Sequence, residues 1–154
     1  MNLYPINAGN FKLDGGAMFG VVPKSLWQKT NPSDSDNLID LTARCMLIES
    51  GSRLILVDAG MGDKQSEKFF SYYKPWGDDS LIRSINKAGF SIDEITDVFL
   101  THLHFDHCGG ATVLNSNNVS VPLFKNAKYW SNKNHWEENL FVLEDGVIPS
   151  SNSI

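Results

Sequence analysis

The sequence predicts an α/β fold, in which short β-strands alternate with helices around one core. Two apolar runs, Leu41–Ile48 and Arg53–Val57, are joined by Glu49-Ser50-Gly51-Ser52, which is typical of a β-hairpin. The later segment Ser80–Ala88 has apolar residues at helical spacing. A third apolar run, Val98–Leu100, leads directly into a cluster of histidines. Functional side chains of α/β folds usually lie on such loops, just beyond the end of a strand.

The region before the hairpin is expected to be an edge strand followed by loops. Leu3–Leu13 mixes apolar and polar residues, as a strand at the edge of a sheet does. The Gly-rich segment Asp14–Gly20 is predicted to be a loop. The polar segment Thr30–Asn37 contains Pro32 and is predicted to be a surface loop.

The end of the hairpin and the following helix have recognisable boundaries. The hairpin's second strand runs into Asp58-Ala59-Gly60-Met61-Gly62, a turn that leaves Asp58 at the strand's carboxyl end. Asp78 and Asp79 can cap a helix over Ser80–Ala88, and Gly89 can end it. One further helical turn is expected at Ile92–Ile95.

The last part of the chain is expected to contain one more strand and a short helix. Leu123–Trp130 is predicted to be a strand. Ser131 can cap a helix that carries His135. The polar segment Gly146–Ile154 is expected to be frayed.

Composition narrows the classes of protein that this chain can represent. Its 154 residues suffice for one domain, and 42% hydrophobic content is typical of a globular chain. The net charge of −5 and the lack of a basic run argue against nucleic-acid binding. No apolar stretch approaches the ~20 residues that span a bilayer. Met1–Asn10 lacks the features of a signal peptide, and two cysteines, Cys45 and Cys108, make no disulfide framework. A cytoplasmic protein is therefore expected.

The strongest chemical signal is the segment Thr101–Gly110, where three of the four histidines and one aspartate lie within six residues. Imidazole and carboxylate are ligands that zinc prefers, although iron, manganese and nickel accept them too. His102 and His104 lie two residues apart, so in extended backbone they point to the same side and can bind one ion. Asp106 and His107 follow after the chain turns and can face a second ion about 3.5–4 Å away.

Two neighbouring ions predict a hydrolytic reaction. Bound zinc lowers the pKa of water to about 7, which provides a hydroxide nucleophile at neutral pH. Asp106 can orient that hydroxide and then pass a proton to the leaving group. Gly109 and Gly110 leave room for backbone to pass close to the ions.

The segment Thr101–Gly110 resembles the His-x-His-x-Asp-His signature of the metallo-β-lactamase superfamily. Asp58 also resembles the aspartate that supports the metal ligands from behind in that family, and Gly15–Gly20 is similar to the start of its lactonase-like branch of metal-dependent hydrolases. The resemblance implies an αβ/βα sandwich that hydrolyses a lactone or related ester or amide, usually with two zinc ions. By this resemblance His102 and His104 bind the first metal, and Asp106 and His107 bind the second.

The sequence departs from the family after His107. The family completes its site with another histidine, a bridging carboxylate and a last histidine, whereas this chain offers only His135. Residues 1–136 therefore resemble the N-terminal part of the family's domain, and the tail 137–154 is not placed. Three explanations stay open: a piece of a longer hydrolase, a half-fold completed by a second copy or a complementing chain, or a degenerate protein. A half sandwich exposes one sheet face, so a homodimer or larger oligomer is expected.

Simpler interpretations also stay open. The cluster can bind metal without catalysis, and the chain can then act through association. Thr101 is interpreted as filler of the strand, and Cys108 as a packing residue rather than a soft metal ligand. The aromatic side chains of the segment 63–79 can line a substrate entrance, or they can belong to the core; they are Phe69, Phe70, Tyr72, Tyr73 and Trp76.

Overall fold

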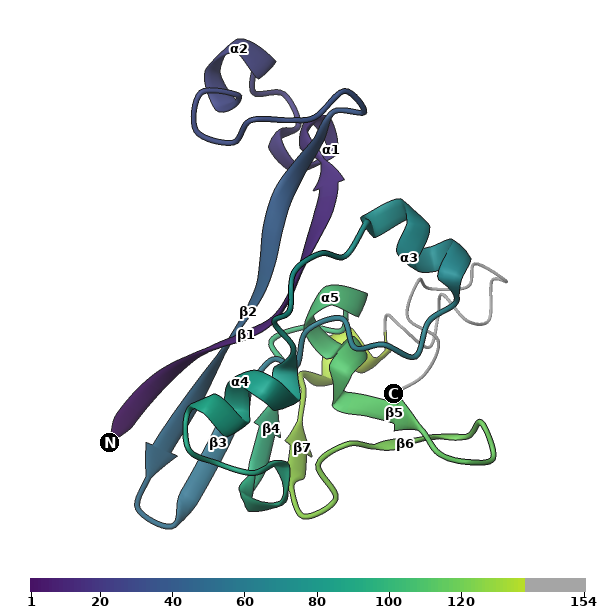
Figure 1. Cartoon of the computed structure of the whole chain (residues 1–154). Coiled ribbons are helices and arrows are strands. Elements are labelled where there is room, and N and C mark those ends of the chain that lie inside the picture. Colours follow the sequence, from purple (N-terminus) through teal and green to yellow (C-terminus); the bar gives the residue numbers. More distant parts are fainter. Residues whose placement is uncertain (138–154) are drawn as a thin grey trace.

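A five-stranded mixed sheet forms the centre of the computed structural model, which describes residues 1–137 (Figure 1). Its strands lie in the order β1 (Asn2–Asp14), β2 (Leu38–Ser50), β3 (Arg53–Val57), β4 (Asp97–Phe99) and β7 (Lys128–Trp130). The pairs β1–β2 and β2–β3 are antiparallel, whereas β4 runs parallel to β3 and β7 parallel to β4. The predicted α/β fold, with its edge strand and hairpin, is confirmed.

The predicted strand at Leu123–Trp130 is only partly correct, because β7 covers just its last three residues. Before β7 the chain turns: Ala127 N donates to Phe124 O, and Phe124 N donates to the Tyr129 hydroxyl. Phe124 is fully buried, so its apolar character reflects a core position in a turn rather than a strand.

The Gly-rich segment predicted to be a loop instead forms the short helix α1 (Gly15–Phe19). The Asp14 side chain caps it by accepting a hydrogen bond from Ala17 N at 2.7 Å. Trp27, from α2 (Lys24–Trp27), lies so close that a Cβ at Gly15 would be 2.5 Å from its ring. Glycine is therefore required here for a close approach within a helix, not for loop flexibility.

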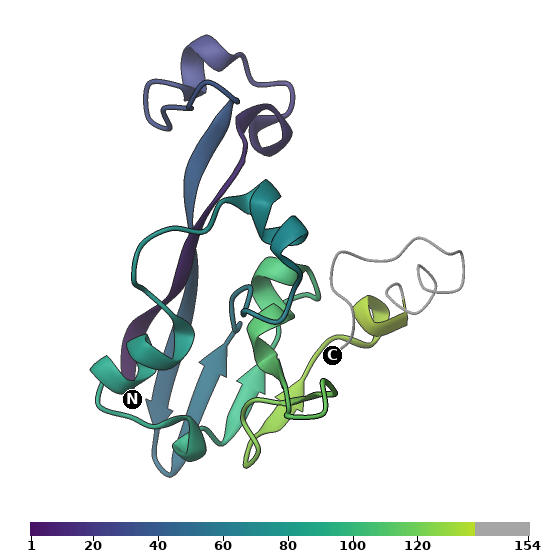
Figure 2. The same cartoon turned by 45° about the vertical axis from the view of Figure 1, so that its right-hand side comes forward.

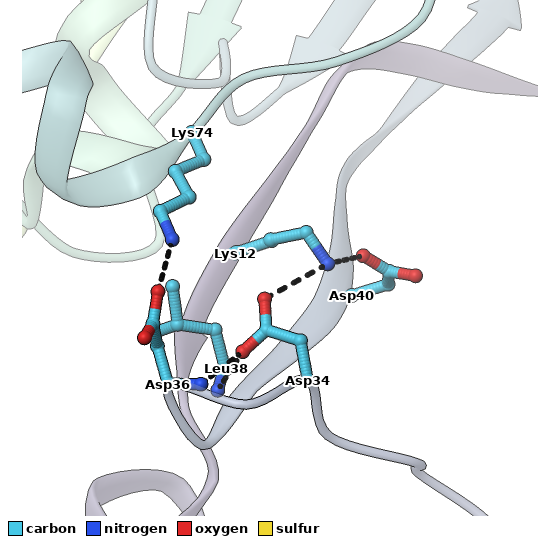
Figure 3. Close-up of polar contacts among 6 residues, drawn as sticks. All are labelled: Lys12, Asp34, Asp36, Leu38, Asp40 and Lys74. Atoms are coloured by element: carbon cyan, nitrogen blue, oxygen red, sulfur yellow. Dashed lines mark hydrogen bonds and ion pairs between the residues drawn. The ribbon is translucent and has the colours of Figure 1, made fainter.

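The β1–β2 hairpin extends beyond the rest of the sheet and carries α1 and α2 at its far end (Figures 1 and 2). Its loop at residues 30–37 is irregular, as predicted. Lys12 lies between Asp34 and Asp40, and Lys74 contacts Asp36 at 2.6 Å (Figure 3). The last contact joins the hairpin loop to the residue that follows α3 (Glu67–Tyr73).

Two helices begin at serine caps that the sequence interpretation did not assign. The helix predicted at 80–88 is confirmed as α4 (Leu81–Lys87), but Ser80 caps it in place of Asp78 and Asp79. The helix α3 was not predicted at all; Ser66 caps it by accepting from Phe69 N. The expected helical turn after α4 is confirmed as the 3₁₀ helix η1 (Ile92–Glu94).

The remaining elements follow β4 and continue the core. They are α5 (Phe105–Cys108), the 3₁₀ helix η2 (Gly109–Ala111), and the antiparallel pair β5 (Thr112–Leu114) and β6 (Ser120–Pro122). Residues 133–137 are helical, and Asn132, not Ser131, accepts the capping bond from Asn134 N. The predicted frayed tail lies outside the described residues. No helix within residues 1–137 is long and apolar enough to cross a membrane.

The helices cover one face of the sheet. Leu47, Leu56 and Val98 are fully buried on that face, and Ile85 of α4 and Phe124 belong to the same core cluster. Side chains alternate between the two faces of a strand, so the neighbours of these residues point the other way. Burial on one side thus assigns α4 and the turn at Phe124 to that side.

The opposite face is apolar and is not covered by any described residue. Met46, Phe99 and Trp130 are exposed there by 39–49%. Ile55 and Val57 are half-buried beside them and line a shallow hollow. A contiguous apolar surface of this kind is typical of an interaction surface.

An ion pair between the buried Asp97 and the exposed Arg53 stabilises this open face. Asp97 is 4% exposed and accepts bonds from Arg53 Nη2 at 2.7 Å and Trp130 Nε1 at 2.8 Å. The Arg53 guanidinium, with further hydrogen bonds from Thr96 and Trp130, holds the pKa of Asp97 well below its usual value. The carboxylate therefore connects β3, β4 and β7 across the sheet.

Replacing Asp97 with asparagine is expected to lower the free energy of unfolding at pH 7 by about 2 kcal/mol, because charge-assisted hydrogen bonds are lost. Because the pKa of Asp97 is lower in the folded than in the unfolded chain, its carboxylate stabilises the fold at pH values above the unfolded pKa of about 3.9. This stabilisation is lost as the pH falls through the folded pKa. The difference between wild type and Asp97→Asn should therefore shrink below about pH 4. Urea unfolding at several pH values measures this, with Asp93→Asn, an exposed carboxylate, as the control. An equal loss at all pH values would contradict the assignment.

Candidate functional site

Asp58 lies at the centre of the candidate site, where β3 ends. Its backbone φ of +59° is in the left-handed region, which aspartate tolerates better than most residues. Its backbone N donates to Phe99 O at 2.9 Å, which places it beside the end of β4. Asp58 is therefore at a strand's carboxyl end, as predicted, and next to the loop that carries the histidines.

The Asp58 carboxylate accepts hydrogen bonds from three groups of that loop. Thr101 donates its backbone N at 2.9 Å and its hydroxyl at 2.9–3.0 Å. His107 Nδ1 lies 2.9 Å from Asp58 Oδ2. An ionised carboxylate can only accept, so the His107 proton is on Nδ1 and its Nε2 is free to bind a metal.

Thr101 extends this network to His102. Its one hydroxyl proton goes to Asp58, so its oxygen acts as the acceptor for His102 Nδ1 at 3.1 Å. The proton of His102 is then also on Nδ1, and Nε2 is free. The interpretation of Thr101 as strand filler was therefore wrong; the sequence signal was its position directly before the first histidine of the cluster.

The structure brings the predicted metal-binding residues together. The His102 ring centroid lies 3.9 Å from that of His107 and 4.6 Å from that of His104. Asp106 Oδ2 is 3.5 Å from His107 Nε2. Burial, and then the charges of His107 and His104, lower the pKa of His102, which favours the neutral imidazole that binds a metal.

The histidine and aspartate ligands suit zinc, but they are too few to complete the coordination of a single ion. Among residues 1–137, no three His, Cys, Asp or Glu side chains are grouped so that they could hold the same metal. The sequence predicts two ligands for each ion from this loop, and a zinc site takes at least three protein ligands. Further ligands are thus needed to complete either ion's shell.

Two other residues of the sequence prediction lie apart from this network. Cys108 is buried in the core, and burial raises the pKa of its thiol to about 11, so it remains protonated at neutral pH. The interpretation of Cys108 as a packing residue is confirmed. His135 is half-buried in the helical segment 133–137.

Backbone packs closely behind the histidine loop. A Cβ at Gly109 would lie 2.2 Å from Met61 O, and one at Gly110 would lie 2.1 Å from Ala59 O. The prediction that these glycines make room for backbone is confirmed. The sequence interpretation missed Lys64, whose ammonium donates to Gly109 O and whose pKa is lowered by burial.

An aromatic group lies beside the loop. The Phe105 ring packs against Tyr73 at 4.5 Å and against Phe69 at 5.4 Å, both from α3. Some aromatic residues of the segment 63–79 thus pack against the histidine loop. Tyr72 and Trp76 of the same segment remain exposed. Its role at a substrate entrance stays a prediction.

Comparison with known proteins agrees with this geometry. The family described as the Metallo-beta-lactamase superfamily matches residues 39–149. The chain belongs to the metallo-β-lactamase superfamily. The resemblance seen in the histidine motif and the predicted fold class are thereby confirmed, and the relatives below are hydrolases.

The individual relatives are similar to this chain over about half of their own length. An N-acyl homoserine lactonase from a Bacillus species is 26% identical over 125 residues, which are 75% of this chain and 47% of that protein. A probable metal-dependent hydrolase from Staphylococcus aureus has a TM-score of 0.82 at 33% identity, over 91% of this chain and 50% of that one. AidC, a dizinc quorum-quenching lactonase, has a TM-score of 0.63 at 27% identity, over 88% and 42% respectively.

Asp58→Asn is expected to weaken zinc binding by about 10- to 100-fold, because the groups that orient metal-binding histidines contribute that much to affinity. Asparagine tolerates the positive φ but presents an N–H₂ group to donors of the loop. Competition with a chromophoric chelator measures the affinity. Thr101→Val should weaken binding in the same direction, and Asp93→Asn should not change it. Unchanged affinity in both site variants would contradict the network.

Proposed function

We propose that this chain carries the first part of a dizinc hydrolase site that cleaves a lactone or a related ester or amide. The observation that supports it best is the network centred on Asp58, which orients His102 and His107 with free Nε2 atoms. We assign His102 and His104 to the first ion and Asp106 and His107 to the second. Other divalent transition metals suit the same ligands.

The residues of the chain have separate tasks in this proposal. Bound zinc supplies a Lewis acid and lowers the pKa of water to about 7. Asp106, whose side chain is 22% exposed, is next to His107 and is placed to orient the attacking water. The same carboxylate would accept the proton that this water loses and pass it to the leaving oxygen or nitrogen. Asp58 and Thr101 hold the rings of His107 and His102 in place throughout.

The substrate that we propose has an apolar acyl group. Phe105 is part of the histidine loop, and Phe69 and Tyr73 pack against it, so an apolar wall adjoins the proposed ions. AidC was solved with the product N-hexanoyl-L-homoserine, which contains such an acyl chain. An N-acyl homoserine lactone is therefore the first substrate to test.

His104→Ala should lose bound zinc and any hydrolysis of N-hexanoyl homoserine lactone together, because the ring supplies one ligand of the first ion and no other group within residues 1–137 is assembled to replace it. Metal content by elemental analysis and ring opening by pH-stat titration measure the two effects. Trp136→Ala, in the helical segment after β7, serves as the control. Full activity or full metal content in His104→Ala would contradict the assignment.

The remaining ligands need a second polypeptide layer, which we propose comes from another copy of the chain or from a complementing C-terminal half. The apolar face with Met46, Phe99 and Trp130 supports this, since it is the exposed side of the sheet. Relatives of which this chain covers only about half are consistent with such a second layer.

Sedimentation velocity, combined with zinc analysis of protein purified without added metal, tests the assembly. We expect a dimer with about two zinc ions per chain, because each ion then gains ligands from the partner. Phe99→Lys should produce monomers and lower the zinc content, because a charge on the apolar face opposes association. A monomeric wild type with one ion or less would contradict self-completion and favour a separate C-terminal half.

A non-enzymatic role is the second candidate, and the same exposed face favours it. In that role the chain binds metal weakly and works by association through the sheet. A zinc-loaded oligomer that hydrolyses none of a panel of lactones, thioesters and amides would favour this candidate over the hydrolase.

A further inference from the structure

A small apolar tip lies at the far end of the β1–β2 hairpin, away from the histidine loop (Figures 1 and 2). It consists of residues 15–31, which include α1 and α2. Met18, Val22 and Leu26 are exposed by 43–57%, and Val21 is fully exposed. Apolar residues that are exposed singly are ordinary, whereas four of them on one protruding segment indicate a surface that contacts another apolar surface.

The tip is folded around its own aromatic pair. Trp27 is 5% exposed, and its ring stacks on that of Phe19 with the centroids 5.0 Å apart. The end of α1 and the turn after it are held by backbone bonds, since Gly20 N donates to Gly16 O at 2.8 Å and Val22 N donates to Phe19 O at 3.0 Å. The exposed apolar side chains therefore belong to a fixed surface whose own core is already occupied by the two rings.

The charge of the tip is opposite to that of the whole chain. Residues 15–31 contain Lys24 and Lys29 but no aspartate or glutamate, whereas the chain has a net charge of −5. Neither lysine forms an ion pair within residues 1–137. Lys24 Nζ donates instead to the neutral amide oxygen of Asn37 at 2.7 Å and lies 5.6 Å from the ring centroid of Trp27. Both ammonium groups thus keep their charge available to an anionic partner.

The carboxylates of the adjoining hairpin loop already have cationic partners (Figure 3). Asp34 and Asp40 lie 3.7 and 2.7 Å from Lys12, and Asp36 lies 2.6 Å from Lys74. These ion pairs offset much of the negative charge next to the tip. An approaching anionic surface therefore meets the two unpaired lysines of the tip together with its exposed apolar side chains.

We propose that this tip docks on the surface of an anionic lipid bilayer. Apolar side chains flanked by lysines are the composition of segments that lie at the interface between lipid and water, where long lysine side chains reach the phosphates. Each lysine near an anionic bilayer strengthens binding about fivefold. A second copy of the chain suits the tip less well, because two tips in contact would bring four ammonium groups together and no carboxylate from residues 15–31. This inference does not rest on the proposed hydrolase function.

Sedimentation of the full chain with lipid vesicles tests the proposal. Vesicles of phosphatidylcholine with about 30% phosphatidylglycerol should bind the chain at least tenfold more tightly than vesicles of phosphatidylcholine alone, because the two lysines act only on the charged surface. Raising the salt concentration to about 0.5 M should remove most of this difference. Equal affinity for both kinds of vesicle, or no binding up to about 5 mM lipid, would overturn the proposal.

Two double variants of exposed tip residues identify the surface that binds. Val21→Ser/Leu26→Ser and Lys24→Gln/Lys29→Gln should each weaken binding to the anionic vesicles about tenfold. The matched controls make the same changes on other exposed residues: Leu114→Ser/Val119→Ser and Lys125→Gln/Lys128→Gln. Far-UV circular dichroism verifies that each variant is folded. A loss in the controls as large as in the tip variants would overturn the assignment to the tip.

An environment-sensitive fluorophore distinguishes a lipid surface from a second copy of the chain. The native cysteines Cys45 and Cys108 are both buried, so a thiol-reactive nitrobenzoxadiazole label attaches selectively to an exposed Val21→Cys variant. Its emission should shift to the blue when anionic vesicles are added, whereas the same label on Ser116→Cys, at the exposed turn between β5 and β6, should not respond. A blue-shifted emission of the Val21→Cys label that is present without vesicles and is lost on dilution would show that a second copy covers the tip, and would overturn the proposal.

Discussion

The site depends on the hydrogen bonds that the Asp58 carboxylate accepts from the histidine loop. It joins the end of β3 to the loop after β4, two places that are far apart in the sequence. Because the carboxylate can only accept, it determines which nitrogen of His107 carries the proton and, through Thr101, which nitrogen of His102 does. The rings are thus oriented by the fold before any ion binds. Preorganisation of this kind is what makes a metal site tight and selective.

Close backbone packing behind the loop supports that orientation. Gly109 and Gly110 pass so near Met61 and Ala59 that no side chain fits between them. The same packing brings the turn after β3 against η2, with Lys64 donating to the Gly109 carbonyl. Glycine is needed at both positions because a larger side chain would clash with this backbone. The close packing keeps the histidine loop rigid.

Within residues 1–137, only one face of the sheet is covered by other parts of the chain. Its covered face holds the main core, and its other face presents Phe99 and Trp130 around the ion pair of Arg53 and Asp97. An edge site of an α/β sandwich takes ligands from both halves, so a single layer supplies an incomplete set. In the proposed function, one partner layer supplies further metal ligands and covers this open face.

The sequence by itself determined the α/β pattern, the position of Asp58 at a strand's end and the histidine motif, because periodicity and ligand spacing are local properties of the chain. Only the tertiary structure decided the role of Thr101, since its partner Asp58 is distant in the sequence. The helix at Gly15 depends on packing by Trp27, and the buried turn at Phe124 depends on contacts with Tyr129. Such contacts produce no repeating pattern in the sequence, because the fold as a whole decides which segments lie next to each other.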